Sequence, residues 1–155
     1  MEYEELLLEA ERAGLLVKEK CLPLSDGRIK GKRIAIRRDI PTLTKKADVL
    51  AEELGHYYTS VGRIVEQDTV NARKQERTAR LWAYNKRIGL TGILRAFQNH
   101  CTSRYEIAEY LGVSEDTLAE ALEYYRQIYG EGVMVDNYLV QFEPVLQVYA
   151  YFPIV

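Results

Sequence analysis

Three side chains in the stretch Ala51–Tyr58, which reads A-E-E-L-G-H-Y-Y, have the spacing of a metal-dependent hydrolytic site. Glu52 and His56 are four residues apart, so on a helix both point to one side and can bind a single ion. Glu53 then lies beside that ion, where its carboxylate can activate a water. This is the logic of the H-E-x-x-H helix of zinc peptidases, with Glu52 in place of the first histidine. The alternative for the motif alone is a solvated helix face.

The replacement of a histidine by Glu52 changes the metal that we expect. A carboxylate can bind zinc, so the site is retained, but the ligand set becomes harder and more anionic. The sequence therefore predicts one divalent metal, with zinc as the first choice and manganese as the second.

Glu76, twenty residues after His56, is the candidate third ligand. On a helix it shares a stripe with Ala72, Ala79 and Ala83, whose small side chains allow a second helix to approach closely. A lone carboxylate on such a seam is costly to bury, and a metal ion would remove that cost. Taken alone, Glu76 has the alternative of being a surface acid.

The elements that must position these residues follow from periodicity and turn residues. We expect a helix over residues 2–13, short strands over 15–36 that include Arg33–Ile36, and a helix that Thr44 caps and that runs to about Tyr58. Gly62 marks the end of the helical stretch, and a further helix is predicted over 71–87 with Trp82 as a core anchor. The buried face of the second helix is predicted to contain Ala47, Leu50, Leu54, Tyr57 and Val61.

The second half of the chain is predicted to be mainly helical, with Gly89 and Gly92 breaking or bending the preceding helix. Short helices are expected over 91–98, 104–111 and 115–129, followed by a β-hairpin over 133–152. Residues Ile107–Tyr125 follow the helix-turn-helix pattern, and the hairpin could serve as a wing. The second helix of the pair is acidic, which disfavours DNA binding and favours a structural pair or a protein-docking surface; its acids are Glu115, Asp116, Glu120 and Glu123.

Composition sets the class of protein. The chain has 155 residues, 47% hydrophobic and 28% charged, with a net charge of −2, which is typical of a globular domain and argues mildly against a nucleic-acid binder. Cys21 and Cys101 are expected to be reduced buried thiols. The acidic N-terminus is unlike a signal peptide and no stretch reaches the length of a membrane span, so we expect a cytoplasmic protein. The apolar tail Tyr149–Val155 is either a buried final strand or an interface.

The two motifs together resemble those of a known family. Ala51–Thr59 (A-E-E-L-G-H-Y-Y-T), followed by E-x-x-A-x-x-W-A at Glu76–Ala83, is similar to the ImmA/IrrE family of metallopeptidase-like proteins, in particular its short members encoded by prophages and integrative elements. The resemblance covers about residues 25–130. It implies a gluzincin-like site in which Glu53 is the general base, His56 and Glu76 are metal ligands, and Glu52 occupies the place of the first ligand.

The resemblance also implies a fold and a function. The fold expected is α+β, with a zincin-like domain over residues 1–100 that includes a small sheet, and a helix-turn-helix-like pair plus hairpin over 101–155. The function expected is that of an endopeptidase that cleaves a helix-turn-helix repressor of a mobile element, with the strand Arg33–Ile36 pairing with the substrate. The alternatives are an inactive relative that sequesters a repressor and, second, a DNA-binding regulator.

Overall fold

The computed structural model describes residues 2–60 and 69–151, excluding the side chains of residues 69 and 70. The chain is α+β, as predicted, and divides into two compact units, Met1–Arg87 and Ile88–Val155. The domain boundary predicted between residues 100 and 101 stays a prediction. None of the described helices combines the length and the apolar character needed to cross a membrane.

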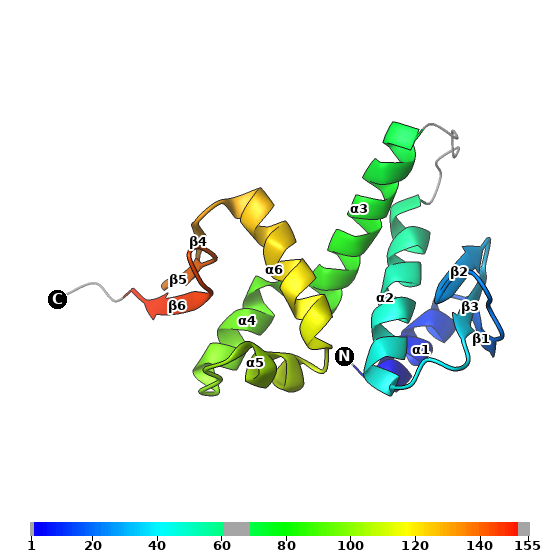
Figure 1. Ribbon diagram of the computed structural model, residues 1–155, viewed down its shortest axis with the longest axis horizontal. Helices are drawn as coiled ribbons and strands as arrows, with labels where there is room; N and C mark the ends of the chain where they lie inside the picture. Colours follow the sequence, from blue (N-terminus) through cyan, green and yellow to red (C-terminus); the bar gives the residue numbers. More distant parts are fainter. Residues whose placement is uncertain (1, 61–68, 152–155) are drawn as a thin grey trace. The chain divides into compact units, whose positions relative to one another are not determined.

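The first unit packs a small sheet against helices (Figure 1). Its elements, in chain order, are α1 (Tyr3–Arg12), β1 (Leu16–Lys20), β2 (Gly27–Lys30), β3 (Arg33–Arg37), α2 (Leu43–Ser60) and α3 (Thr69–Arg87). The strand order is β1-β3-β2, with β1 parallel and β2 antiparallel to β3. Gly31, at φ +59°, occupies the tight β2–β3 turn, where the left-handed conformation suits glycine.

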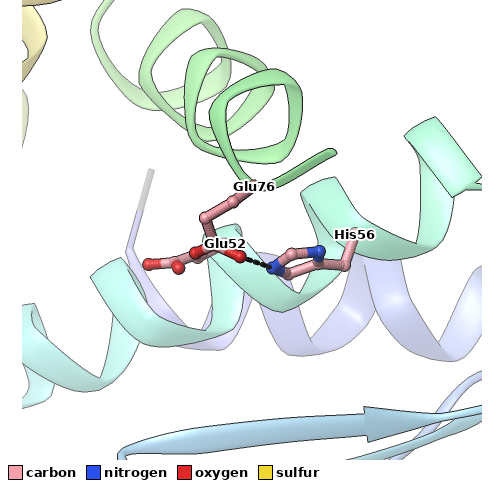
Figure 2. A group of neighbouring side chains, drawn as sticks. All are labelled: Glu52, His56 and Glu76. Carbon is pink, nitrogen blue, oxygen red and sulfur yellow. Dashed lines mark ion pairs between the residues drawn. The ribbon is translucent and has the colours of Figure 1, made fainter. Parts of the chain in front are cut away.

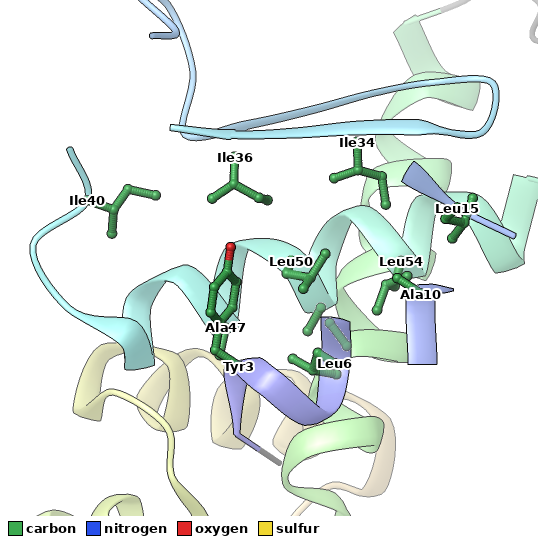
Figure 3. Close-up of a cluster of buried hydrophobic side chains, with 12 residues drawn as sticks. Tyr3, Leu6, Ala10, Leu15, Ile34, Ile36, Ile40, Ala47, Leu50 and Leu54 are labelled. Atoms are coloured by element: carbon green, nitrogen blue, oxygen red, sulfur yellow. The ribbon is translucent and has the colours of Figure 1, made fainter. Parts of the chain in front are cut away.

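The core of this unit lies between one face of the sheet and the two helices α1 and α2. Ile34 and Ile36 on β3 point toward Leu50 and Leu54 of α2, and Leu6 of α1 completes the cluster (Figure 3). All five side chains are almost fully buried. Burying a side chain of this size contributes about 1.5–3 kcal/mol, so this cluster fixes α2 against the sheet.

Two expectations about this unit need correction. Thr42, not Thr44, caps α2: its Oγ1 accepts a hydrogen bond from the Lys45 amide at 3.1 Å. Either threonine suits a cap, and only the backbone path selects between them. Trp82 is half-buried at the edge of the core, where it stacks on Tyr58 at a centroid distance of 5.1 Å. The predicted helix end at Gly62, and Val61 before it, lie outside the described residues.

The strand Arg33–Ile36 was expected to pair with a substrate, and this expectation is wrong. It is present as β3, but both of its edges already pair, with β1 on one side and β2 on the other. A strand between two neighbours has no free backbone groups to offer.

The second unit contains helices and an antiparallel sheet. Its elements are α4 (Gly89–Gln98), α5 (Arg104–Leu111), α6 (Glu115–Tyr129), β4 (Gly132–Val135), β5 (Tyr138–Gln141) and β6 (Gln147–Ala150). The predicted helical pair is confirmed: Gly112 adopts φ 68° in the turn, and the Ser114 side chain accepts a hydrogen bond from the Thr117 amide.

The predicted C-terminal hairpin is part of a larger sheet. Three strands, in the order β4-β5-β6, replace the two expected, because the chain turns at Asp136, which adopts φ 52°, and Val135 pairs with Tyr138. The alternative of a buried final strand is wrong for Tyr149, which is 45% exposed.

The two cysteines are free, as expected, but neither is buried. Cys21 is exposed and Cys101 is partly buried. Cys21 directly follows β1, beyond the part of the strand that packs on the core, so it has no apolar layer to enter.

Candidate metal centre

The structure brings Glu52, His56 and Glu76 together. Glu52 and His56 project from successive turns of α2, and Glu76 reaches them from α3 (Figure 2). One ligand atom from each residue lies within 4.8 Å of the others, and His56 Nε2 is 3.1 Å from Glu76 Oε2. Their roles as metal ligands stay a prediction, but the predicted convergence of these side chains is present.

Close packing of α2 against α3 makes this convergence possible. A Cβ atom added to Gly55 would lie 2.3 Å from the Ala79 carbonyl oxygen, so only glycine fits at this crossing. Glycine inside a helix costs about 1 kcal/mol relative to alanine. The close approach of α2 and α3 explains why glycine is present despite this cost. The predicted small-residue seam is formed by Ala79 and Ala83, which are buried, whereas Ala72 is exposed and lies outside it.

The carboxyl groups of Glu52 and Glu76 shift each other's pKa values in opposite directions. Burial and the hydrogen bond to Glu76, opposed by the charge of Arg80, together raise the pKa of Glu52 to about 7. Burial also raises the pKa of Glu76, but the hydrogen bond from Glu52 and the electrostatic effects of His56 and Arg80 outweigh it, so the net shift is downward. Glu52 is therefore the member of the pair that keeps its proton to the higher pH.

Glu53 occupies a different environment from its neighbour Glu52. Only 8% of it is exposed. Burial, together with the negative charge of Glu76, raises the pKa of Glu53 to about 7. A carboxyl group with a pKa near the working pH can both accept and return a proton, as a general base must.

These residues line an open hollow of about 480 Å³ in the first unit. Three elements form its walls: the loop before β2 with β2 itself, α2, and α3. The lining side chains and backbone are those of Ser25, Asp26, Gly27, Arg28, Ile29, Val49, Glu52, Glu53, His56, Glu76 and Arg80.

Two residues of this hollow, Gly27 and Arg80, were not predicted from the sequence as part of the site. Arg80 Nε lies 3.2 Å from Glu76 Oε1 and 3.5 Å from Glu52 Oε1, so its guanidinium balances part of the negative charge. Its position four residues after Glu76 on a helix was the available signal. Gly27 lies against the general-base candidate: a Cβ atom there would lie 3.0 Å from Glu53 Oε1 and clash with Val49.

The free edge of β2 borders the same hollow. The Arg37 amide donates a hydrogen bond to the Asp26 carbonyl at 2.7 Å, and Gly27 lies opposite Ile36 in the next pair. Because hydrogen-bonded pairs alternate along an antiparallel ladder, the backbone groups of Arg28 and Lys30 also point toward β3. The N–H and C=O groups of Gly27 and Ile29 therefore point to the open edge. Sequence alone could not identify this edge, because strand order depends on long-range pairing.

The donor set fits a divalent ion. Two carboxylates and one imidazole are common ligands of first-row metals, and three protein ligands leave a position open. A cation between the neighbouring carboxylates of Glu52 and Glu76 would relieve the repulsion between them. Because two of the three ligands are oxygen donors, manganese remains an alternative to zinc as the bound ion.

A comparison with family models places the chain among known proteins. A family model described as the IrrE N-terminal-like domain of a peptidase family matches residues 10–123, which is most of the chain and contains every residue of the candidate centre. No curated protein and no solved structure matches.

Proposed function

Because the chain belongs to the peptidase family with an IrrE N-terminal-like domain, we propose that it is a metal-dependent endopeptidase with a zincin-like first unit. The observation that carries the proposal is the convergence of Glu52, His56 and Glu76 from two helices beside the buried Glu53. Neither helix supplies three ligands alone, and the Gly55–Ala79 contact that unites them has a cost in helix propensity.

The chain's own residues have separate roles in this proposal. Glu52, His56 and Glu76 hold the ion, zinc or alternatively manganese, which when bound would polarise the scissile carbonyl and the attacking water. Glu53 takes the proton of that water on a carboxylate oxygen and returns it to the leaving amide nitrogen. Arg80 orients the carboxylates of Glu52 and Glu76 through its two ion pairs.

The substrate in this proposal is a helix-turn-helix repressor of a mobile element, which places the activity in the cytoplasm. An extended segment of the repressor would add as a strand to the free edge of β2, pairing with the backbone groups of Gly27 and Ile29. This replaces the pairing with β3, which has no free edge. The absence of a side chain at Gly27 lets Val49 and Glu53 pack directly against this edge strand, so the carboxyl group of Glu53 lies beside the backbone that such a segment would pair with.

The test is a cleavage assay with the repressor encoded beside this protein. The protein is incubated with the repressor and either zinc or manganese, and fragments are followed by mass spectrometry. Cleavage that requires the metal and is lost in Glu53→Gln is the expected result. If the repressor stays intact with the wild type as well as with Glu53→Gln, over a range of metal concentrations, the proposal is contradicted.

A second function, repressor binding without cleavage, is favoured by one observation. The Arg80 guanidinium already contacts both Glu52 and Glu76, so it can neutralise them without a metal. This alternative predicts tight repressor binding that a chelator does not change, and no metal in protein purified without a chelator. One equivalent of zinc or manganese by elemental analysis supports the peptidase instead.

DNA binding through α5 and α6 is not proposed. The acids Glu115, Asp116, Glu120 and Glu123 on α6 are exposed. They would face the phosphates of a duplex, where like charges repel.

A further inference from the structure

The small net charge of the chain conceals an uneven distribution between its two units. Residues 1–87 contain 18 Lys and Arg against 14 Asp and Glu, whereas residues 88–155 contain 3 against 9. The first unit is therefore positive and the second negative, by charges of +4 and −6. The composition of the whole chain does not exclude an anionic partner for the first unit.

The positive charge of the first unit gathers on the outer face of its sheet. Ile34 and Ile36 of β3 point into the core, so Arg33, Ala35 and Arg37 point outward. The strand register then places Lys30 opposite Arg33, and Lys18 and Arg28 on either side of Ala35. Lys20 pairs with Arg37 in the adjacent row. Each row across this face thus contains at least two basic side chains.

Five of these cations, which we call the basic face, have no acidic partner. They are Lys18, Lys20, Arg28, Lys30 and Arg33; all are exposed, and none forms an ion pair within the part of the chain that the structure describes.

The nearby acids do not compensate the basic face. Asp26 and Asp39 both pair with Arg37. Glu19 of β1 points to the inner face of the sheet, where it binds Lys46 of α2. The outward-pointing positions of the three strands contain no acid.

This arrangement costs stability in the isolated protein. Directly opposed side chains in an antiparallel pair lie about 5 Å apart, and like charges there are destabilising. Arg33 and Lys30 are such a pair. An anionic partner across the whole face would convert this repulsion into attraction.

We propose that the basic face binds the phosphate backbone of duplex DNA. Its cations spread in two dimensions, about 4.8 Å apart across strands and about 6.7 Å apart along them, so several can contact a polyanion at once. Duplex DNA supplies one charge per about 1.7 Å of its axis, a density that few protein surfaces reach. The face has no aromatic side chain on which unpaired bases could stack, which favours a duplex over a single strand.

Binding of this kind is independent of base sequence. Lysine and arginine side chains on a flat sheet reach phosphates rather than base edges, and phosphate contacts carry no sequence information. The inference does not rest on the proposed peptidase activity: the basic face lies on the strand surface opposite the core, and although Arg28 also lines the hollow, none of Glu52, His56 or Glu76 belongs to the face. For a protein that acts on a repressor, such binding would raise its local concentration at repressor-bound DNA.

The test measures the salt dependence of binding to a fluorescently labelled duplex of arbitrary sequence by anisotropy, with the full chain. Binding in low salt, about 50 mM, should weaken steeply with salt, because each phosphate contact contributes about −0.9 to the slope of log K against log salt. The triple variant Arg28→Gln/Lys30→Gln/Arg33→Gln should lose at least about tenfold in affinity and about three units of slope.

A control variant with the same change in net charge separates the face from general electrostatics. Lys45→Gln/Arg73→Gln/Lys74→Gln removes three exposed cations from helices α2 and α3 and should keep more than half of the affinity. Equal loss in both triple variants, or no binding by the wild type in low salt, overturns the proposal. Thermal melts verify that each variant is folded.

Two further outcomes would assign the basic face to another partner and so overturn the proposal. Competition by poly-glutamate as strong as that by the duplex would indicate an acidic protein. Self-association in low salt that the basic-face variant abolishes, without DNA binding, would indicate the acidic unit of a second copy. Duplex binding should persist in EDTA and in Glu53→Gln, so this test can succeed or fail independently of the peptidase test.

Discussion

At the scale of single residues, the candidate centre depends on two neighbouring carboxyl groups with different partners. Glu52 faces Glu76 and Arg80, whereas Glu53 is buried beside Gly27. In both cases burial is the main cause of a pKa raised to about 7. Glu52 is suited to release its proton to solvent when a cation binds, and Glu53 to exchange a proton with a substrate.

The raised pKa values predict that the metal-free protein loses stability as pH rises. Between about pH 4.5 and 7 the folded state keeps protons on Glu52 and Glu53 that the unfolded state has released, so folding is favoured at the acidic end. The free energy of unfolding, from urea titrations in EDTA, should fall by about 1–3 kcal/mol across this window. Glu53→Gln should show a smaller fall, whereas the exposed Glu131→Gln should match the wild type. An equal fall in Glu53→Gln would contradict the assignment.

Metal binding should have the opposite dependence on pH. Glu52 must release its proton before it can bind a cation, so affinity should rise between pH 6 and pH 8. Zinc or manganese at about 100 times its Kd should raise the stability by about 2.7 kcal/mol. Calorimetric titration should show a loss of at least about tenfold in affinity for His56→Ala. Unchanged affinity in His56→Ala would remove this residue from the ligand set.

At the scale of elements, one helix crossing determines whether a site exists. The Gly55 backbone contacts the Ala79 carbonyl, and this contact sets how closely Glu76 approaches Glu52 and His56. A second link between the same helices is the ion pair of Asp48 with the buried Arg87 at the end of α3. The two links fix α3 against α2 at separate points.

Gly55→Ala should therefore destabilise the protein although alanine is the better helix former. The gain of about 1 kcal/mol in propensity is smaller than the cost of displacing α3. We expect a net loss of about 2–3 kcal/mol in urea unfolding, together with weaker metal binding. Lys45→Ala, an exposed change in the same helix, should stay within about 0.5 kcal/mol of the wild type. A Gly55→Ala protein that is more stable than the wild type and binds metal normally would show that α2 and α3 leave room for a side chain at Gly55.

At the scale of the whole molecule, opposite charges are segregated into the two units. The basic face concentrates unpaired cations on one sheet surface, and the second unit contains most of its acids on exposed helices. Such segregation favours anionic partners for the first unit, at the expense of its own stability.

The basic-face variant should consequently be more stable than the wild type while it binds DNA less well. Removing three like charges from neighbouring strands should add about 0.5–1 kcal/mol to the free energy of unfolding in low salt. The increase should shrink as salt screens the repulsion. The control triple variant on α2 and α3 should change little. A destabilised basic-face variant would show that these side chains have structural contacts.

The sequence by itself determined the helices, the helical pair with its Gly112 turn, and the residues that could bind a metal. These follow from local rules: the i, i+4 spacing of Glu52 and His56, helical periodicity, and capping residues. Thr42 and Thr44 mark the limit of such rules, because both suit a cap.

Tertiary structure alone decided the rest. That β3 is central and β2 offers the free edge depends on which strands pair, and pairing joins residues far apart in the chain. The approach of Glu76, the involvement of Arg80 and Gly27, and the raised pKa values follow from packing between α2, α3 and the sheet. The basic face likewise appears only when three strands align, because its cations are scattered between residues 18 and 33 of a chain whose net charge is −2.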